Sequence, residues 1–508
     1  MITGEIKHKL DRLWDAMWSN NMTNPWIDIQ QVTYLIFIKM LDDNQIRVER
    51  KVHNMIANGI EASIDEFNPV FKSGNYVDID NRIDVPYKEL RWSVFKEFEP
   101  KRMFDNLKNN VFPFIKTLHG DKETAFASFM KDAQFTVSNP YILDKMVASL
   151  SDESLGLSDK DMMGDCYEYL LSKMATSGAN GQFRTPRHII DMMVEIAKPS
   201  LKDNIIDPAM GTAGFLVESA KYIQAHYARE MMNKENHRHY NNTMFTGYDT
   251  DDDMLRIGCM NMTLHSVENP IIRKNDSLAE EYNEHDKYSL ILANPPFSGS
   301  LDPSTVSKSL NQISGGTQKK VLLFLSLFLR ILKTGGRCVS IFSSGVFDNS
   351  TDGSFTRLRT QLVEEQKLEA IIFMPNGIFQ PYSPVQTGIL VFTKTNSGGT
   401  DKVWLYNMEA DGYSLDKKRD KIDANDIPDI VARWNNLEAE NERTPYDKSF
   451  FITKQEIVDN GYVFSFNKYH KKEIVKKEYR PTGEIIKSIQ DLEEQFKAVM
   501  DEICKDIK

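Results

Sequence analysis

Residues 204–216 read Asn-Ile-Ile-Asp-Pro-Ala-Met-Gly-Thr-Ala-Gly-Phe-Leu. A short apolar run that ends in Asp207 is typical of a buried strand, and glycines in a strand-to-helix turn let the backbone approach a ligand closely. No Gly-Lys-Ser/Thr follows and the glycines are not spaced as Gly-x-Gly-x-x-Gly, so neither a phosphate loop nor a dinucleotide fingerprint is indicated. A carboxylate at a strand end suits a cationic ligand head, such as an ammonium or a sulfonium-bearing amino acid. A tight connection without a ligand is the alternative.

Strands and helices alternate on the carboxyl side of this stretch. Further strands are predicted at 244–249, 289–294, 338–342, 369–374 and 388–392. Helices are predicted at 215–230, 254–267 and 321–333. Nearly continuous apolar strands that alternate with helices indicate an α/β fold, with a parallel sheet covered by helices on both faces. In such sheets ligands bind beyond the carboxyl ends of the strands, so motifs at those ends carry the most information.

The composition is that of a globular protein. The chain has 508 residues, of which 41% are apolar and 27% charged, enough for about three domains of ~150 residues each. There are 62 lysines and arginines and 73 aspartates and glutamates, so the net charge is −11. This balance argues against a generally basic nucleic-acid binder, although a local basic channel or a basic partner stays open.

Several features predict a cytoplasmic protein without a membrane segment. The four cysteines are far apart and form no Cys-x-x-Cys pair, which indicates neither a disulfide framework nor a zinc site. The amino terminus lacks the apolar core of a signal peptide. The longest apolar run, 321–332, is too short for the ~20 residues that a membrane span needs.

Three parts are expected along the chain: a helical domain at 1–160, the α/β domain at 161–410, and a charged region at 411–508. The last part ends in a helix at about 485–507 whose apolar residues alternate spacings of four and three, as in a coiled-coil seam: Ile485, Ile489, Leu492, Phe496, Val499, Ile503 and Ile507. This helix either docks on a partner or packs against its own chain. The basic stretch 468–480 either contacts DNA phosphates or is a solvated charged segment.

The most informative motif is Asn294-Pro295-Pro296-Phe297, which follows the strand predicted at 289–294. Two prolines end the strand ladder and fix the backbone. The Asn294 side-chain carbonyl and the Pro295 carbonyl provide two neutral acceptors, suited to the two hydrogens of a planar amino group. Phe297 adds an aromatic face for a planar substrate. A plain strand-ending turn is the alternative.

Carboxylates follow two other strands. Asp249 is placed to accept both hydroxyls of a ribose, and Asp276 either bonds the amino group of an adenine or simply ends a strand. The acidic run at 249–253 lacks the glycine and the distal glutamate of a calcium loop, so no metal site is predicted and Thr250 is expected to cap a helix. Thr185 before Pro186 predicts another helix start, whose free N–H groups suit a carboxylate.

In this order, Phe-x-Thr-Pro, Asp-Pro-x-x-Gly-Thr-x-Gly-Phe and Asn-Pro-Pro-Phe resemble the gamma class of DNA adenine-N6 methyltransferases. More narrowly, the chain resembles the modification subunit of type I restriction–modification systems over about residues 10–480. The resemblance implies a Rossmann-like sheet that uses S-adenosylmethionine, an all-α amino-terminal domain and a carboxyl-terminal helical tail. It also implies the cofactor-binding residues Gln182, Phe183, Thr185, Pro186, Arg187, Asp207, Gly211, Thr212, Ala213, Gly214, Asp249 and Asp276.

The same resemblance implies that Asn294, Pro295, Pro296 and Phe297 form the catalytic motif. Two positions depart from the commonest family pattern: Ala213 stands where a glycine is usual, adding a methyl group near the cofactor, and Asp249 stands where a glutamate is frequent. The implied reaction is methyl transfer to N6 of an adenine that has been flipped out of the duplex. Implied partners are double-stranded DNA, a specificity subunit that holds two modification subunits, and a separate restriction subunit.

Two other readings are open. A protein-glutamine or RNA methyltransferase also uses Asn-Pro-Pro on an amide or amine, but usually has Tyr at the fourth position. A non-catalytic assembly subunit would have no need of an intact Asp207, Asn294 and Phe297. The Gly/Ser/Thr-rich segment 298–320 is predicted to be a mobile lid beside the pocket, with a plain flexible loop as the alternative.

Overall fold

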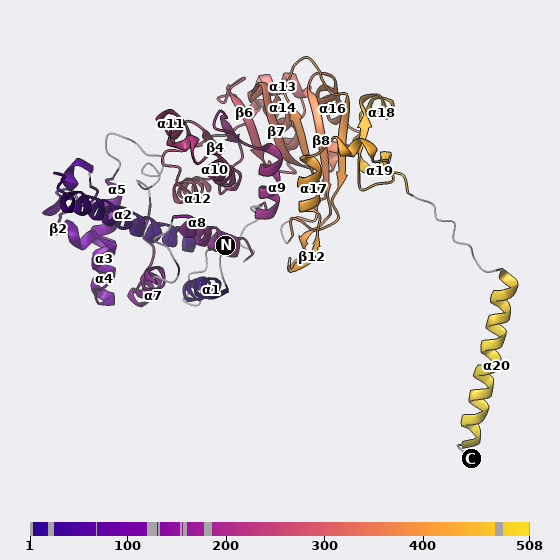
Figure 1. The fold of residues 1–508 in the computed structure, drawn as a ribbon, viewed down its shortest axis with the longest axis horizontal. Coiled ribbons are helices and arrows are strands. Elements are labelled where there is room, and N and C mark those ends of the chain that lie inside the picture. The colour runs from indigo at the N-terminus through magenta and orange to yellow at the C-terminus, as the bar shows by residue number, and fades with distance from the viewer. Residues whose placement is uncertain are drawn as a thin grey trace. The chain divides into compact units, whose positions relative to one another are not determined.

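The computed structural model of this chain describes residues 4–18, 25–67, 69–118, 130, 133–152, 155, 160–176, 185–380, 383–472 and 481–506 (Figure 1). It divides into two compact units, Met1–Tyr469 and His470–Lys508. The expected domain boundary at residue 410 therefore falls inside the first unit.

The amino-terminal part is built from helices. They are α1 (Gly4–Trp18), α2 (Pro25–Ala57), α3 (Trp92–Phe95), α4 (Pro100–Asn106), α5 (Phe112–Lys116), α7 (Pro140–Ser151) and α8 (Lys160–Thr176). The long α2 buries Ile29, Val32, Ile36 and Met40, which recur at helical spacing on one face. The expectation of an all-α domain needs one correction, because β1 (Asn75–Asp78) and β2 (Ile83–Pro86) form a small antiparallel hairpin within it.

Nine strands in the described part of the chain form one central sheet, in the order β13-β10-β8-β9-β7-β6-β3-β4-β5. Their bounds are β3 (Ile205–Asp207), β4 (Phe245–Asp249), β5 (Ile271–Lys274), β6 (Tyr288–Ala293), β7 (Leu332–Ser343), β8 (Lys367–Met374), β9 (Thr387–Thr393), β10 (Lys402–Asn407) and β13 (Ser449–Thr453). The strands β5, β4, β3, β6 and β7 run parallel to one another, so their carboxyl ends meet at one edge.

Helices cover both faces of this sheet, as the sequence predicted (Figure 1). On one face, Ile341 and Ile389 of the sheet share a core with α9 (Arg187–Ala197), α10 (Gly214–His226) and α12 (Asp252–Leu264). On the other face, Phe342 and Leu390 share a second core with α14 (Lys320–Ile331) and α16 (Gly353–Glu364). Successive strand residues point to opposite faces, so both faces of these strands are apolar and buried.

The expectation of a parallel sheet is wrong for β9, and the sequence analysis did not predict β13, which is also antiparallel. Strand β9 pairs antiparallel with both β7 and β8, and β13 pairs antiparallel with β10. The segment that joins β8 to β9 contains no crossover helix among its described residues, so the chain returns in the opposite direction. An apolar run such as 388–392 reads the same in either direction, which is why the sequence did not reveal this.

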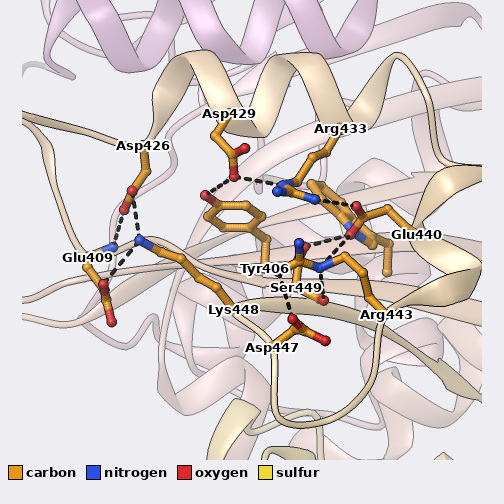
Figure 2. Close-up of polar contacts among 11 residues, drawn as sticks. Tyr406, Glu409, Asp426, Asp429, Arg433, Glu440, Arg443, Asp447, Lys448 and Ser449 are labelled. Atoms are coloured by element: carbon orange, nitrogen blue, oxygen red, sulfur yellow. Dashed lines mark hydrogen bonds and ion pairs between the residues drawn. The ribbon is translucent and has the colours of Figure 1, made fainter.

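The edge of the sheet at β13 is stabilised by the segment between β10 and β13. This segment includes β11 (Asp411–Tyr413), β12 (Lys421–Asn425), α17 (Ile427–Trp434) and a short helix, η7 (Ala439–Glu442). The buried Glu440 carboxylate accepts hydrogen bonds from Trp404 Nε1 at 2.9 Å, Ser449 Oγ at 2.6 Å and Arg433 at 2.7 Å (Figure 2). In turn, Trp434 Nε1 donates to the Ile196 carbonyl at 3.0 Å, so α17 also fixes the end of α9.

The remaining helices are α11 (Lys234–Asn242), α13 (Lys308–Ser314), α15 (Gly345–Asp348), α18 (Lys454–Asp459), α19 (Phe466–Tyr469) and α20 (Thr482–Asp506). Helix α20 matches the predicted heptad helix, except that Ile507 lies outside the described residues. Its apolar side chains are exposed, with Leu492 at 64% and Phe496 at 67%. No helix among the described residues is long and apolar enough to cross a bilayer.

Candidate active site

The loop at 208–214, between β3 and α10, is held by its own backbone and by the end of β4. The Ala209 N–H donates to Asp207 Oδ1 at 3.1 Å, and the Gly211 N–H donates to Asp249 Oδ2 at 3.0 Å. Gly211 has φ +51°, and a Cβ added there would meet no atom within 4 Å. The loop therefore presents an open, side-chain-free surface at the carboxyl edge of the sheet, as a closely approaching ligand requires.

Ala213 does not place its methyl group toward this open surface. The residue is fully buried, and its Cβ lies 3.3 Å from the position that a Cβ on Gly258 of α12 would occupy. Ala213 adopts φ +62°, a left-handed conformation that favours glycine. The extra methyl group thus faces α12 and imposes backbone strain on the loop, whereas the sequence analysis expected a contact with the cofactor.

Two carboxylates lie side by side at the ends of β3 and β4. Asp207 is buried, and this burial, reinforced by the charge of Asp249, raises its pKa to about 8. Burial also raises the pKa of Asp249, against hydrogen bonds from the N–H groups of Asp251 and Gly211. A cationic group placed beside them would reverse these shifts, because an opposite charge favours the ionised carboxylate.

The end of β5 completes this half of the edge. The Asn275 N–H donates to the Asp249 carbonyl at 3.0 Å, and the Ser277 hydroxyl donates to the Pro208 carbonyl at 2.7 Å. Asp276, between them, is exposed and accepts a hydrogen bond from the Leu278 N–H at 3.0 Å. Its side chain is therefore on the same edge as Asp249 and accessible to a ligand.

Asn294 follows β6, next to β3 in the sheet. Its Nδ2 donates to Thr185 Oγ1 at 2.9 Å, while its Oδ1 is buried and accepts no hydrogen bond from the described residues. A buried carbonyl oxygen without a partner is costly unless something binds it. Thr185 was expected to cap α9, but Pro186 occupies the cap position and the Thr185 hydroxyl orients the amide of Asn294 instead.

The rest of the motif forms an aromatic corner. Pro295 is buried, Pro296 is exposed, and Phe297 is half-buried with its ring in edge-to-face contact with Phe379, 5.3 Å between centroids and at 75°. Phe379 follows β8 and is fully buried. Phe379 was not among the predicted site residues, because nothing in its local sequence indicates a contact with Phe297.

The flanking element is described only in part. Gln182 and Phe183 lie outside the described residues. Arg187, at the start of α9, donates to Asp165 Oδ1 at 3.2 Å and lies 3.8 Å from Glu218 Oε2. Its guanidinium is thus paired with α8 and α10, so its assignment to the cofactor stays a prediction.

The amino-terminal helices α2 and α8 contact α12, and α12 in turn holds the loop at 208–214. Asn261 of α12, fully buried, donates from Nδ2 to the Thr212 carbonyl at 2.9 Å and to the Glu168 carboxylate of α8 at 2.5 Å. Gln30 of α2 donates to Asp253 Oδ1 at 2.6 Å.

Asp251, one residue after the predicted Thr250, caps α12 through the N–H groups of Asp253 and Met254. The described residues contain no cluster of three or more His, Cys, Asp or Glu suited to a metal ion.

Comparison with known families gives two matches. The model described as N-6 DNA Methylase matches residues 158–478, and the model described as HsdM N-terminal domain matches residues 6–150. The first match covers more than half of the chain and includes the loop at 208–214 together with Asn294-Pro295-Pro296-Phe297. The chain belongs to the N-6 DNA methylase family.

Relatives of this N-6 DNA methylase chain are methylase subunits of type I restriction enzymes. The EcoEI methylase subunit of Escherichia coli is 29% identical over 61% of this chain and 61% of its own length. The EcoKI methylase subunit of Escherichia coli (strain K12) is 27% identical over 67% of this chain and 66% of its own length. The matched part thus spans 61% and 66% of the lengths of these two relatives, and the resemblance to type I modification subunits is confirmed.

A solved structure agrees with the N-6 DNA methylase fold. The type I restriction-modification system methyltransferase subunit from Streptococcus thermophilus superposes with a TM-score of 0.66, covering 92% of this chain and 99% of that chain at 18% identity. At this identity the similarity concerns the fold: a helical amino-terminal part and a central sheet covered by helices.

One predicted feature of the site differs in the structure. Segment 298–320 contains α13, whose Leu310 is fully buried, and Arg330 donates to Ser307 Oγ at 2.9 Å and to Ser309 Oγ at 2.7 Å. Its two ends are joined by a bridge between Ser300 and Lys319. The composition suggested a loop without anchors, but from Val306 onward the segment is held by the buried Leu310, by Arg330 and by a bridge between Val306 and Ala279. The lid stays a prediction for the exposed part at 298–305.

Proposed function

We propose that this chain is the modification subunit of a type I restriction–modification complex in the cytoplasm, and that it transfers a methyl group from S-adenosylmethionine to N6 of a flipped-out adenine in DNA. The observation that carries the proposal is the orientation of Asn294. Its Nδ2 is held by Thr185, so its Oδ1 faces away from that bond as a buried acceptor without a protein partner.

The residues at the ends of β3, β4 and β5 fit the cofactor. The open surface over Gly211 admits a ligand against the backbone, and Asp207 lies beside it for a cationic amino-acid head. Asp249 would hold the ribose hydroxyls and Asp276 the adenine ring. S-adenosylmethionine, when bound, supplies an electrophilic methyl group. The loop at 208–214 would fix its position, and proximity provides much of the rate.

The residues after β6 would hold the target amine. Asn294 Oδ1 and the Pro295 carbonyl would accept its two hydrogens, which localises the nitrogen lone pair for attack. Both acceptors are neutral, so the proton that the nitrogen loses after methyl transfer would pass to solvent water, while the C–S bond of the sulfonium breaks to leave a neutral thioether. Phe297, braced by Phe379, would stack on the base. An amino group in a stacked duplex is out of reach, so the adenine must leave the helix.

The test is to co-express the chain with its neighbouring reading frames and to map modified adenines in the host DNA. We expect N6-methyladenine at one sequence with the wild-type chain and none with Asn294→Ala. Asn460→Ala, which changes a half-buried amide directly after α18 that donates to the Glu456 carbonyl, is the matched control and should keep full modification. Methyl transfer to protein or RNA, with none to DNA, would replace this function by the alternative ones.

The proposal includes assembly through α20. Its apolar side chains recur at coiled-coil spacing and are exposed, which suits a helix of a specificity subunit that reads the DNA sequence. Two modification subunits per specificity subunit and a separate restriction subunit complete the proposed complex. Leu492→Asp with Phe496→Asp should abolish co-purification and leave cofactor binding intact, whereas the polar-face control Asp491→Ala should keep both co-purification and cofactor binding. Unchanged assembly would refute the docking role of α20.

A further inference from the structure

A second hollow lies at the carboxyl edge of the sheet, away from the cofactor half. It is a small cavity with about 100 Å³ accessible to water, partly open to solvent, beyond the ends of β7, β8 and β10 and beside α19. Its polar lining comes from Ser344, Asp348, Gln386, Asn407, Ser465 and Asn467. The carboxyl edge of an α/β sheet is where such folds bind ligands, but the proposed methyl transfer uses none of these residues.

This cavity is separate from the aromatic corner at Phe297. Phe379, which contacts Phe297, belongs to the core under α9 and α17. The rings that line the cavity, Phe347, Phe373 and Phe466, belong to the core on the α14 and α16 face. The cavity and the aromatic corner therefore adjoin different cores, one on each face of the sheet.

The polar side chains of the cavity are available for a ligand. Within the described residues, the amides of Gln386, Asn407 and Asn467 make no hydrogen bond to another side chain or to the backbone. Primary amides provide both donors and acceptors, the combination that matches the edge of a nucleobase. The rings of Phe373 and Phe466 add an aromatic wall.

The charges around the cavity distinguish a base from a phosphate. Among the described residues no lysine or arginine lines it, and Asp348 lines one side, so these residues disfavour an anion. Lys468, exposed and next to Asn467 in α19, is placed outside the lining. A neutral base inside with its backbone phosphate near Lys468 satisfies both observations.

We propose that this cavity binds an unpaired nucleobase of the DNA on which the chain acts, as a second base site besides the target pocket at Asn294. The inference rests on the proposed function for the identity of the nucleic acid. Flipping one adenine disrupts stacking nearby, so a site for a neighbouring unstacked base would stabilise the distorted DNA.

The test uses the full chain with a fluorescein-labelled single-stranded oligonucleotide, followed by fluorescence anisotropy. Losing amide contacts to one stacked base should weaken binding about tenfold in the double variant Asn407→Ala with Asn467→Ala. Asn435→Ala, an exposed amide at the end of α17, is the matched control and should bind as the wild type does. Cofactor affinity should be equal in all three proteins.

The place where the base binds is tested with the same oligonucleotide carrying 5-iodouracil, by identifying the peptide to which it crosslinks under light. A crosslink within 465–467 supports the second base site even if no methylated adenine is found, so it is distinguishable from failure of the proposed function. Superimposable binding curves for wild type and double variant would overturn the site. Loss of specificity-subunit binding in the double variant, with oligonucleotide binding intact, would overturn it in favour of a protein partner.

Discussion

Asn294 and Thr185, 109 residues apart in the sequence, are joined by a hydrogen bond of 2.9 Å from the amide Nδ2 to the hydroxyl oxygen. This bond ties the end of β6 to the residues before α9. It determines which end of the amide faces the proposed target amine.

Thr185→Val keeps the shape of the side chain and removes the acceptor. We expect kcat for DNA methylation to fall about tenfold, because the Asn294 amide loses the bond that orients it. Cofactor affinity should change less than twofold. Thr185→Ser restores a hydroxyl and should recover most of the rate in single-turnover assays. An unimpaired rate in the valine variant would show that Thr185 does not position Asn294.

Asp207 should couple the binding of the cofactor to the release of a proton from its carboxyl group. Its pKa of about 8 means that the carboxyl is protonated at pH 7 before a cation binds. An ammonium or sulfonium favours the ionised form, so binding at pH 7 should release about one proton and should strengthen as pH rises toward 8. Calorimetry in two buffers of different ionisation enthalpy measures this release.

Two variants test whether Asp207 is the group that releases the proton. Asp207→Asn should bind cofactor more weakly and without proton release, while Asp423→Asn, on the exposed strand β12, should behave as the wild type does. Equal proton release in the wild type and Asp207→Asn would assign the proton to another group.

Asn261 links the amino-terminal helices to the loop at 208–214. Asn261→Ala removes the donor shared by the Thr212 carbonyl and the buried Glu168 carboxylate. We expect a loss of about 1–3 kcal/mol in unfolding free energy and a several-fold rise in the cofactor Kd. Urea unfolding and calorimetry test both effects, with the exposed Asn242→Ala as control. A stability loss without any change in Kd would limit Asn261 to a structural role.

Glu440 is the centre of the polar network at the sheet edge (Figure 2). Glu440→Ala leaves the Trp404 N–H and Arg433 without their shared carboxylate, and breaking a buried pair in this way costs about 3–5 kcal/mol. This is a large part of the ~5–15 kcal/mol that stabilises a typical domain. The exposed Glu442→Ala should lie within about 0.5 kcal/mol of wild type by thermal unfolding. Equal melting temperatures for the two variants would contradict the prediction.

Much of the fold could be predicted from periodicity alone. The strands that end at Asp207, Asp249 and Ala293, and the helices between them, lie within a few residues of where the apolar patterns placed them. Strand direction could not be read in the same way, because β9 is apolar on both faces whichever way it runs. Strand β13, with its short run at 449–453, carried too little apolar sequence to separate it from the charged segments around it.

The candidate site could be predicted where its residues lie in one stretch of the chain, and less well where a contact joins residues that are distant in the sequence. The loop at 208–214 and the carboxylates after β4 and β5 needed only local sequence. The Thr185 hydroxyl bond, the Phe379 ring and the Asn261 bridge depend on residues brought together by the sheet order and by α12. The left-handed backbone of Ala213 directs its methyl group into the core, a result that side-chain chemistry alone does not give.

The exposed apolar seam of α20 also has a consequence at the bench. Leu492, Phe496 and Val499 are each more than half exposed. Such surface adheres to any comparable surface at high concentration. A preparation of this chain alone should therefore give a mass in light scattering that grows with concentration, and crystallisation should be easiest with that seam covered or removed.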